Sequence, residues 1–510
     1  MKLFYTFSII SILVLFSNKS NAQQFNRPIP NALFPYEYVN NGLDDTGYFL
    51  MTPQKLYISQ GAPDYKVPYS ALIDSDGYIC WYDKGQNIDF KFYQESNLYS
   101  YTFISSNGVQ TVILDNNFNS LDTISSVNTS QDVHDIQIAD NGNWLLTTIY
   151  FDTVDLSAYT FNGIQGSSTT VIKGGGVQEI DGSGNLIFDW NSNDYIFPTE
   201  TYDFYSYSDN VFDYCHINAI EEDDDGHILI SFRHLNAIYK INRLTGDVIW
   251  KLGGNSSDFT FLGDNGFSGQ HDIRKLQNGN YSLFNNGNMD IPQITRGVEY
   301  QLDTINWTAT LISEYIHPTN LYAQAMGSYQ FTNDYLVSGF GFIRYPFPSV
   351  ILSDHSNNIL SEFYLEDSVV SYRVQYAYPT LPERPQITCE WNGFNWTLKG
   401  PDGASTYRWS VGGNTQSIDL TQTGTYQVWI PYGTGFLGSL PLVVTDINDP
   451  CGSLDLEEGL SSLDADGNYI LYNLLGQTIV KPQKETIYIQ LFESGYSRKI
   501  MFMNTPINNE

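Results

Sequence analysis

The sequence predicts an all-β protein whose largest part is a β-propeller. Aromatic residues make up 15% of the 510 residues, with 38 Tyr and 30 Phe, and such residues favour half-buried strands over helices. The chain is also longer than one hydrophobic core usually supports, which favours a repetitive fold with smaller appendages. A propeller meets both conditions, because radial repetition protects sheet edges without one oversized core.

A repeated hairpin supports this fold. A short apolar strand, a turn of Asp, Asn and Gly, and a second strand that often carries Trp recur along the chain. The turns lie at residues 74–77, 140–142, 181–184, 223–226 and 277–279. Turn residues of this kind accept positive φ, so each repeat predicts a hairpin. A β-helix is the alternative repetitive fold, but its short and regular coil period is absent.

The first 22 residues have the order of a secretory signal peptide. Lys2 is followed by an apolar run over residues 3–16 and by small residues that end at Ala22, where we expect cleavage. The alternative is a membrane anchor, which needs an apolar run of ~20 residues, and neither this segment nor a later one qualifies. The sequence therefore predicts an exported protein with no membrane-spanning segment.

The propeller should occupy residues 36–381 and end in a proline-rich linker over residues 379–385. The next segment, residues 386–450, has alternating strands that we interpret as an Ig-like β-sandwich. Four cysteines are too few for a disulfide scaffold, although export permits disulfides. We expect Cys389 to pair with Cys451 around this module, and Cys80 and Cys215 to be buried thiols.

The C-terminal segment, residues 461–504, carries two short motifs. Residues 472–477 read YNLLGQ and residues 495–500 read GYSRKI. Both elements, in this order, resemble the C-terminal sorting domain of the type IX secretion system, whose second motif has one more residue between Gly and Tyr. The resemblance implies a partner, the type IX machinery, and a location outside the cell or on the outer-membrane surface. An ordinary small β-module is the alternative.

The net charge of −32 argues against nucleic acid or anionic lipid as a partner, because both are polyanions. An anionic ligand could still bind in a pocket where cations and N–H donors outweigh the general field. Such a pocket must be visible in the sequence as a local group of basic residues.

Three of the seven histidines recur at one position of the repeat. His134 and His271 each begin the triplet His-Asp-Ile and lie eight residues before a turn glycine, and His216 lies ten residues before Gly226. Successive blades of a propeller are related by rotation about the channel axis, so these residues should converge on one funnel. The strand after Gly226 returns to the same face and brings Arg233 there. Its planar fork of donors suits a tetrahedral oxyanion.

Other interpretations of these residues stay open. Each histidine taken singly could be a hydrogen-bonded blade residue. Three imidazoles could also hold zinc, but the fixed charge of Arg233 beside a dication disfavours a metal. The remaining histidines are expected to be structural or exposed and not catalytic; they are His227, His234, His317 and His355.

The ordered set of motifs is more specific than any one of them. It consists of His134-Asp135, His216-Ile217-Asn218, the stretch over residues 231–254 with Arg233 and Trp250, and Gly269-Gln270-His271-Asp272. This set resembles the bacterial arylsulfotransferase family, whose members are six-bladed propellers that work without the cofactor PAPS. The likeness is close over residues 134–287 and loose over the rest of the propeller.

The resemblance implies a ping-pong transfer of a sulfuryl group from a phenolic sulfate donor to a phenol acceptor. By position, His271 matches the nucleophile, and His134, His216 and Arg233 match the residues that bind the sulfate oxygens. It implies neither a cofactor nor a metal. The alternatives are a non-catalytic propeller that binds an anionic or glycan ligand, and a quinone-dependent dehydrogenase. The dehydrogenase ranks last, because it needs Trp-docking motifs in most blades and one good copy is present.

Overall fold

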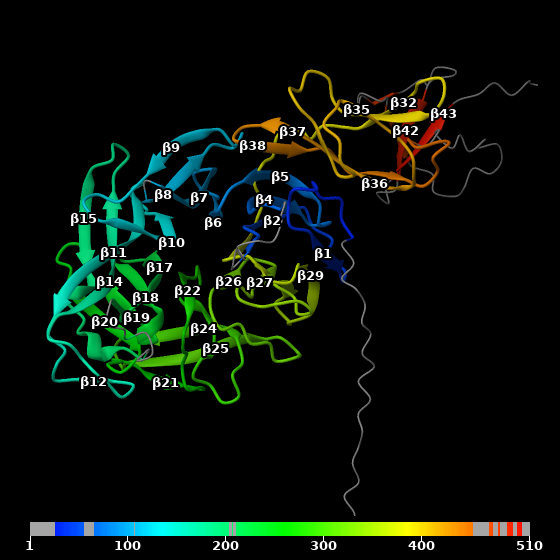
Figure 1. Ribbon diagram of the computed structural model, residues 1–510. Helices are drawn as coiled ribbons and strands as arrows, with labels where there is room; N and C mark the ends of the chain where they lie inside the picture. The colour runs from blue at the N-terminus through cyan, green and yellow to red at the C-terminus, as the bar shows by residue number, and fades with distance from the viewer. Residues whose placement is uncertain are drawn as a thin grey trace, which may run out of the picture. The chain divides into compact units, whose positions relative to one another are not determined.

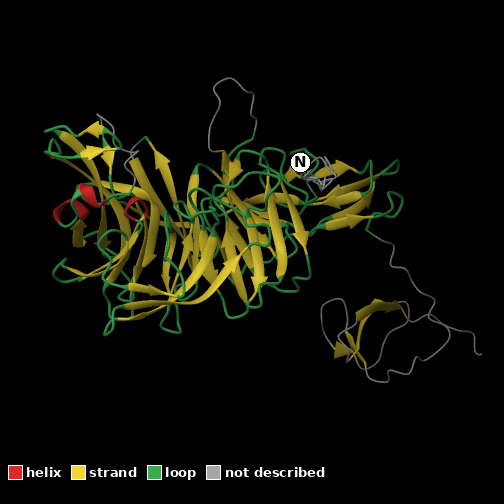
Figure 2. Cartoon of the chain, turned by 90° about the horizontal axis from the view of Figure 1, so that it is seen from below, coloured by secondary structure: helices red, strands yellow, loops and turns green. Residues whose placement is uncertain are grey.

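A computed structural model describes residues 26–55, 66–106, 108–202, 207 and 211–451, and the backbone of strands β40 to β43. The predicted signal peptide, residues 1–22, lies outside the described residues, as does most of the predicted sorting segment. Strands dominate, and the helices of the described part are single 3-10 turns: η1 (Ser192–Asp194), η2 (Pro198–Glu200) and η4 (Arg233–Leu235) (Figure 2). The all-β prediction is confirmed. None of the helices in these ranges has the length and apolarity needed to cross a bilayer.

The chain divides into two compact units, Met1–Pro382 with Tyr432–Phe436, and Glu383–Pro431 with Leu437–Glu510. Within the first unit, six sheets each contain a run of four antiparallel strands. Their members are β6 (Asn87–Tyr93), β7 (Leu98–Ser105), β8 (Gly108–Leu114) and β9 (Ser120–Ile124); β10 (Ser130–Ile138), β11 (Trp144–Val154), β14 (Thr170–Ile180) and β15 (Leu186–Asn191); β17 (Ile217–Glu222), β18 (Ile228–Phe232), β19 (Ala237–Ile241) and β20 (Val248–Gly253); β22 (His271–Lys275), β23 (Tyr281–Asn285), β24 (Arg296–Asp303) and β25 (Thr308–Ile316); β26 (Ser328–Phe331), β27 (Tyr335–Gly339), β28 (Val350–Asp354) and β29 (Ile359–Leu365); and β31 (Val374–Ala377), β2 (Tyr48–Met51), β4 (Tyr69–Asp74) and β5 (Ile79–Lys84).

Shorter strands extend these sheets. Strand β1 (Tyr36–Asn40) pairs with β29, so the N-terminal segment contributes to the two sheets that the C-terminal part of the unit also builds. The other short strands are β3 (Gln54–Lys55), β12 (Thr160–Phe161), β13 (Ile164–Gln165), β16 (Phe212–Asp213), β21 (Thr260–Leu262) and β30 (Val369–Val370). The N-terminal and C-terminal parts of this unit are therefore hydrogen-bonded to each other within two of its sheets.

The first strand of each run lies beside the first strands of its two neighbours. The order of contact is β6, β10, β17, β22, β26, β31 and back to β6, and Figure 1 shows β10, β17 and β22 nearer to the centre than β9, β15 and β25. These six strands, called the inner strands below, therefore surround one axis. The predicted turns join hairpins, and the last glycine of each turn has φ between 77° and 86°.

The hydrophobic cores lie between neighbouring sheets. One cluster joins the sheet of β14 and β15 to that of β18 and β19 and includes Trp190 and Phe232. Another joins the sheet of β17 to β20 to that of β22 to β25 and includes Trp250 and Tyr281. Because these apolar residues pack between sheets, polar side chains can occupy the region around the axis.

The second unit contains short antiparallel strands. They are β32 (Thr388–Trp391), β33 (Trp396–Lys399), β34 (Arg408–Trp409), β35 (Ser417–Asp419), β36 (Gly424–Tyr426), β37 (Val428–Tyr432), β38 (Gly435–Gly438) and β39 (Leu442–Val444), followed by β40 (Tyr469–Tyr472), β41 (Thr478–Ile479), β42 (Ile487–Phe492) and β43 (Ser497–Met501). Strands β32, β33 and β35 form one sheet, and β36 pairs with β39. The Ig-like and sorting interpretations remain predictions.

The disulfide between Cys389 and Cys451 is present, as predicted, and Cys80 and Cys215 are buried thiols. The bridge spans a sequence separation of 62 residues, which corresponds to about 4 kcal/mol of loop-closure entropy removed from the unfolded chain. Replacing both cysteines by Ser should therefore lower the stability of this module. Urea unfolding followed by proteolysis within residues 383–451 measures the loss, and identical protection with and without reductant would contradict it.

Candidate active site

His271 begins inner strand β22 at a bulge. The pairing register of β22 with β23 shifts between His271 and Arg274, and Asp272 adopts a positive φ of 60°. Gly269, two residues earlier, has φ of 64°, and a Cβ there would lie 2.7 Å from Asn288, so the tight approach requires glycine. Bulges of this kind re-aim side chains that regular alternation would place elsewhere.

The contacts of His271 define its tautomer. The ring is 2% exposed, and Nδ1 lies 2.8 Å from Oδ1 of Asn286 and 3.1 Å from the carbonyl oxygen of Gly269. The amide nitrogen of Asn286 donates to the carbonyls of Ala323 and Met326, which orients Oδ1 toward the ring. Two acceptors therefore face Nδ1, so it carries the proton and Nε2 holds the lone pair. The backbone N–H of Met326 donates to Nε2 at 3.2 Å.

His271 is neutral at physiological pH. Burial lowers the pKa of its imidazole well below the ordinary value, and the positive charges of Arg233, His134 and His216 lower it further. An unprotonated Nε2 in a buried position is the state that a nitrogen nucleophile requires.

His134 and His216 are each held by a carboxylate. Nδ1 of His134 is hydrogen-bonded to Asp132, whose Oδ1 also accepts the backbone N–H of His134 at 2.9 Å. Nδ1 of His216 lies 3.0 Å from Oδ2 of Asp213, and His216 has a positive φ of 50°. The two rings meet edge to face with centroids 5.1 Å apart, so both occupy the same end of the axis.

Electrostatics favour the ionised form of the two carboxylates. Burial raises the pKa of Asp213, but the hydrogen bond and charge of His216, with the charge of Lys173, bring that pKa below its usual range. Burial likewise opposes ionisation of Asp132, and His134 reverses the effect and lowers its pKa. Burial lowers the pKa of His216 despite Asp213. Each of the two histidines therefore has a carboxylate beside its Nδ1 that can stabilise an imidazolium ion.

Arg233 follows β18 in the turn η4, as the hairpin argument predicted. Its backbone N–H donates to the carbonyl of His216 at 2.9 Å, and its Nη2 donates to the carbonyl of Gln324 at 3.2 Å. The four predicted residues His134, His216, His271 and Arg233 therefore lie at one end of the axis, and their catalytic roles belong to the proposal below.

His234 belongs to the same cluster. Its Nδ1 donates to the carbonyl of Asp213 at 2.7 Å, and its ring stacks on that of His216 with centroids 4.6 Å apart. Burial and the charge of His216 lower its pKa to about 4. The remaining histidines bond elsewhere: His227 with Arg243, His317 with Thr319, and His355 with carbonyls of residues 332 and 333.

Asp213, His216 and His234 are close enough together to be considered as metal ligands. However, Nδ1 of both rings is already hydrogen-bonded, that of His216 to the Asp213 carboxylate and that of His234 to the Asp213 carbonyl. The carboxylate already accepts from Lys173 at 2.9 Å and from His216. The donor set fits a hydrogen-bonded cluster better than tetrahedral zinc coordination.

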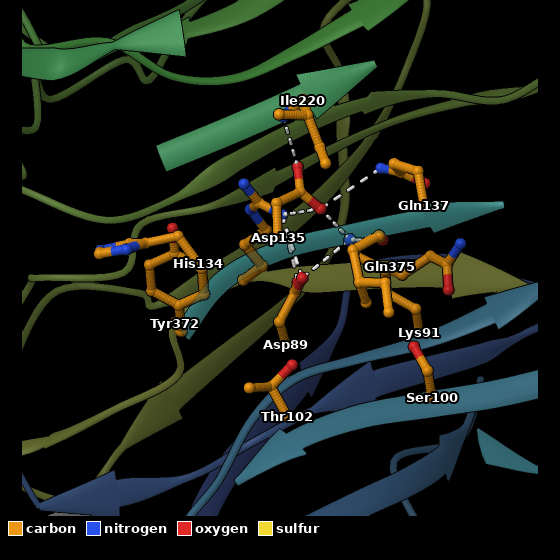
Figure 3. Close-up of polar contacts among 12 residues, drawn as sticks. Asp89, Lys91, Ser100, Thr102, His134, Asp135, Gln137, Ile220, Tyr372 and Gln375 are labelled. Atoms are coloured by element: carbon orange, nitrogen blue, oxygen red, sulfur yellow. Dashed lines mark hydrogen bonds and ion pairs between the residues drawn. The ribbon is translucent and has the colours of Figure 1, made fainter. Parts of the chain in front are cut away.

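A buried ionic network lies next to the histidines, deeper along the axis. It consists of Asp89, Asp135, Asp272, Lys91, Arg274 and Arg373, and Figure 3 shows Asp135 at its centre. The Asp135 side chain is fully buried and contacts Lys91, Arg274 at 3.1 Å and Arg373 at 3.2 Å. Three anions and three cations balance each other, so the network fixes the inner strands without net charge.

Sequence reasoning missed several of these residues. Asp132 and Asp213 lie two and three residues before their histidines, so an Asp-x-His or Asp-x-x-His spacing was available as a signal. Asn286 had a signal too, because β23 returns to the face where β22 begins, and His271 pairs with Phe284. Lys91 and Arg373 gave none, since they come from other sheets.

A sequence family and several solved structures are similar to this chain. The family described as Arylsulfotransferase (ASST) matches residues 104–361. No curated protein sequence matches the chain.

The solved structures are distant in sequence. One is a protein of unknown function from Bacteroides caccae, with 9% identity, a TM-score of 0.41, and coverage of 65% of this chain and 99% of that one. Another is a catalytically inactive virginiamycin B lyase from Staphylococcus aureus, with 13% identity, a TM-score of 0.32, and coverage of 72% and 96%. A third is the β-propeller domain of Cps50 (Swd1) from Myceliophteria thermophila, with 11% identity, a TM-score of 0.32, and coverage of 66% and 95%.

Proposed function

The chain belongs to the arylsulfotransferase family, and on this premise we propose that it transfers a sulfuryl group from a phenolic sulfate ester to a phenol. The observation that carries the proposal is the state of His271, whose Nδ1 proton is held by Asn286 and whose Nε2 is unprotonated and buried. A nitrogen nucleophile beside Arg233 and two carboxylate-backed histidines suits attack on a sulfate ester.

In the first half-reaction, Nε2 of His271 attacks sulfur while the bond from sulfur to the phenolic oxygen breaks. Arg233 binds the sulfuryl oxygens. In the proposed step His134 and His216 take up protons from solvent and act as imidazolium ions, which Asp132 and Asp213 stabilise through their hydrogen bonds. One imidazolium then gives its Nε2 proton to the leaving phenolate, and His271 carries the sulfuryl group.

In the second half-reaction, a phenol occupies the position that the first product left. The neutral histidine takes the phenol proton, the phenolic oxygen attacks sulfur, and the bond from sulfur to Nε2 breaks. His271 returns to its neutral state, so no cofactor or metal is consumed. The first phenol leaves the sulfuryl-enzyme before the acceptor binds, which is the condition for ping-pong kinetics.

Initial-rate measurements with a chromogenic aryl sulfate and a phenol acceptor test this proposal. Double-reciprocal plots at several acceptor concentrations should give parallel lines, because the first product leaves before the acceptor binds. The alternative, a propeller that binds an anionic or glycan ligand without turnover, predicts saturable binding and no phenol release. Converging lines would contradict the sulfohistidine route while leaving transfer itself intact.

We also propose an architecture of six blades and a cellular location for the protein. Each of the six four-stranded runs is taken as one blade of a six-bladed propeller, supported by the closed order of contacts among the inner strands. We further propose that the protein is exported by its signal peptide and carried by the type IX machinery to the outside of the cell or the outer-membrane surface.

Asn286 is proposed as a positioning residue for His271. An Asn286→Ala variant removes the main acceptor for Nδ1–H, so kcat should fall by about 10- to 100-fold while the KM for the donor changes little. An Asn286→Asp variant retains an acceptor and adds a negative charge that raises the pKa of His271. Its activity should recover at alkaline pH and fall earlier on acidification, and an unshifted pH profile would contradict the role.

Arg233 is proposed to bind sulfuryl oxygens through its planar guanidinium. An Arg233→Ala variant should lose about 10²-fold or more in kcat/KM for the donor. An Arg233→Lys variant keeps the charge but loses the fork, so its recovery should be partial. Equal activity of the native and Ala proteins in steady-state assays would exclude this role.

A further inference from the structure

The inner strands line a cavity that the proposed reaction does not use. Its volume is about 250 Å³, and each inner strand contributes to its lining. One residue from each strand, in the order β6, β10, β17, β22, β26 and β31, is Phe92, Gln137, Glu221, Arg274, Phe331 and Gln375.

This cavity lies on the far side of the ionic network from the histidines. His216 immediately precedes β17 and Glu221 is five residues further along the chain, a rise of about 15 Å in an extended strand. None of the four proposed catalytic residues lines the cavity. In Figure 3, His134 and Tyr372 lie on one side of Asp135, and Gln137 and Gln375 lie on the other.

The cations around the cavity are paired with carboxylates of the protein. Lys91 contacts Asp89 at 2.8 Å, the Ile136 carbonyl at 2.9 Å, and Asp135. Arg274 bonds to two carbonyls and to Asp135 and Asp272. Arg373 bonds to the Asn218 carbonyl and to the three Asp residues of the network. Lys275, the fourth cation of the lining, contacts Asp224 at 3.1 Å and Asp223 at 3.5 Å. All four lining cations therefore already have carboxylate partners, which disfavours an anionic ligand.

Glu221 is the surplus charge. Its Oε2 lies 3.4 Å from Nη1 of Arg274, and no hydrogen bond to its Oε1 is found among the described residues. The side chain is 22% exposed, so a ligand can reach it. Three further lining atoms are buried without a hydrogen-bond partner in the described part of the chain: Oγ of Ser282, the hydroxyl of Tyr329 and Nε of Arg373. Glu221 differs from them because its side chain is partly exposed and can accept from a ligand.

Aromatic side chains supply part of the wall. Phe92 and Tyr93 come from β6, and Phe331 comes from β26, where its ring packs edge to face against Tyr329. Aromatic faces attract both apolar groups and cations. With one unbalanced carboxyl group and a net charge of −32 on the whole chain, the field favours a positive ligand.

We propose that this cavity binds a small organic ammonium ion whose N–H groups bond to Glu221 and whose apolar part packs against Phe92 and Phe331. The site is independent of the sulfuryl transfer proposed above, because the ionic network separates the two. Because all six inner strands line the cavity, a ligand bound here also stabilises their arrangement.

Titration calorimetry of the full chain with three probes of one shape tests the charge preference. Benzylammonium should bind with one site per chain, benzyl alcohol at least about tenfold more weakly, and benzoate not at all. Absence of benzylammonium binding at millimolar concentration, or binding of benzoate with equal affinity, would overturn the proposal.

Three variants locate the site. Glu221→Gln keeps the shape of the side chain and should reduce the affinity for benzylammonium by tenfold or more. Its matched control is Glu222→Gln, the next residue of β17, which pairs with Arg243 on the opposite face of the strand and should leave binding unchanged. His271→Ala should also leave it unchanged. Loss of binding in His271→Ala, or full binding in Glu221→Gln, would place the ligand elsewhere and refute the assignment.

The pH dependence of benzylammonium affinity tests the role of Glu221 independently of the variants. Burial raises the pKa of Glu221 to about 7, with Arg274 and Lys91 opposing and Asp135 and Asp272 adding to the rise. Binding requires the ionised carboxylate, so affinity should fall by about tenfold between pH 8 and pH 6, while benzylammonium stays charged. A constant affinity over this range would show that Glu221 does not pair with the ammonium group.

Discussion

A His271→Ala variant is expected to fold normally and to lose sulfuryl transfer by about 10³-fold or more in kcat. The variant lacks Nε2, which no other group at this end of the axis can replace. The other imidazoles, His134, His216 and His234, are each held in place by a hydrogen bond at Nδ1. Steady-state release of phenol from an aryl sulfate measures the loss.

The same assignment predicts how the transfer rate of the native protein responds to acidic pH. The pKa of His271 lies well below its ordinary value, so the nucleophile stays neutral as the pH falls through 6.5. A matched control is His355→Ala, an exposed histidine bonded only to carbonyls of a distant loop, which should keep full activity. Residual transfer in His271→Ala at the native level would remove His271 from the mechanism.

An Asp135→Asn variant is expected to lose about 3 to 5 kcal/mol of stability. Asp135 is fully buried and faces Lys91, Arg274 and Arg373, so its neutralisation leaves an uncompensated positive charge in the interior. It also accepts the backbone N–H of Ile220 at 3.1 Å, which links two inner strands. Urea unfolding followed by fluorescence measures the change.

The pH dependence of stability follows from the same carboxylate. Burial opposes ionisation of Asp135, but the three cations hold its pKa far below the ordinary value. A carboxylate with a lowered folded-state pKa adds stability above its unfolded pKa of ~3.9, and that stability is lost as the pH falls toward the folded value. The native protein should therefore lose stability more steeply below pH ~4 than Asp135→Asn does. The control is Asp140→Asn, an exposed turn residue whose replacement should have little effect, and equal losses would contradict the argument.

The sequence predicted the all-β class and the meeting of His134, His216, His271 and Arg233, because both depend on repetition. Equivalent positions of repeated hairpins are related by rotation, so one register assignment places several side chains. The hairpin argument that brought Arg233 back to His216 applies equally to Asn286, which lies two residues past the partner of His271. That residue was missed because it carries no distinctive motif.

The ionic network could not be predicted from repetition. Asp135 and Asp272 were visible in the repeated His-Asp-Ile triplet, but Lys91 and Arg373 come from sheets that share no pattern with it. Asp89 and Asp272 also depend on bulges with positive φ, 57° and 60°, which non-glycine residues seldom adopt. Long-range pairing of charges and local backbone irregularity both arise from tertiary packing, and a single sequence carries little record of either.

The most direct test of the proposed mechanism is the mass of the peptide that contains His271 after brief exposure of the protein to an aryl sulfate without acceptor. The mechanism predicts that this peptide gains the mass of one sulfuryl group, and that adding a phenol removes it. An unmodified His271 peptide during active turnover, or a sulfuryl group on a different residue, would contradict the assignment of His271 as the nucleophile.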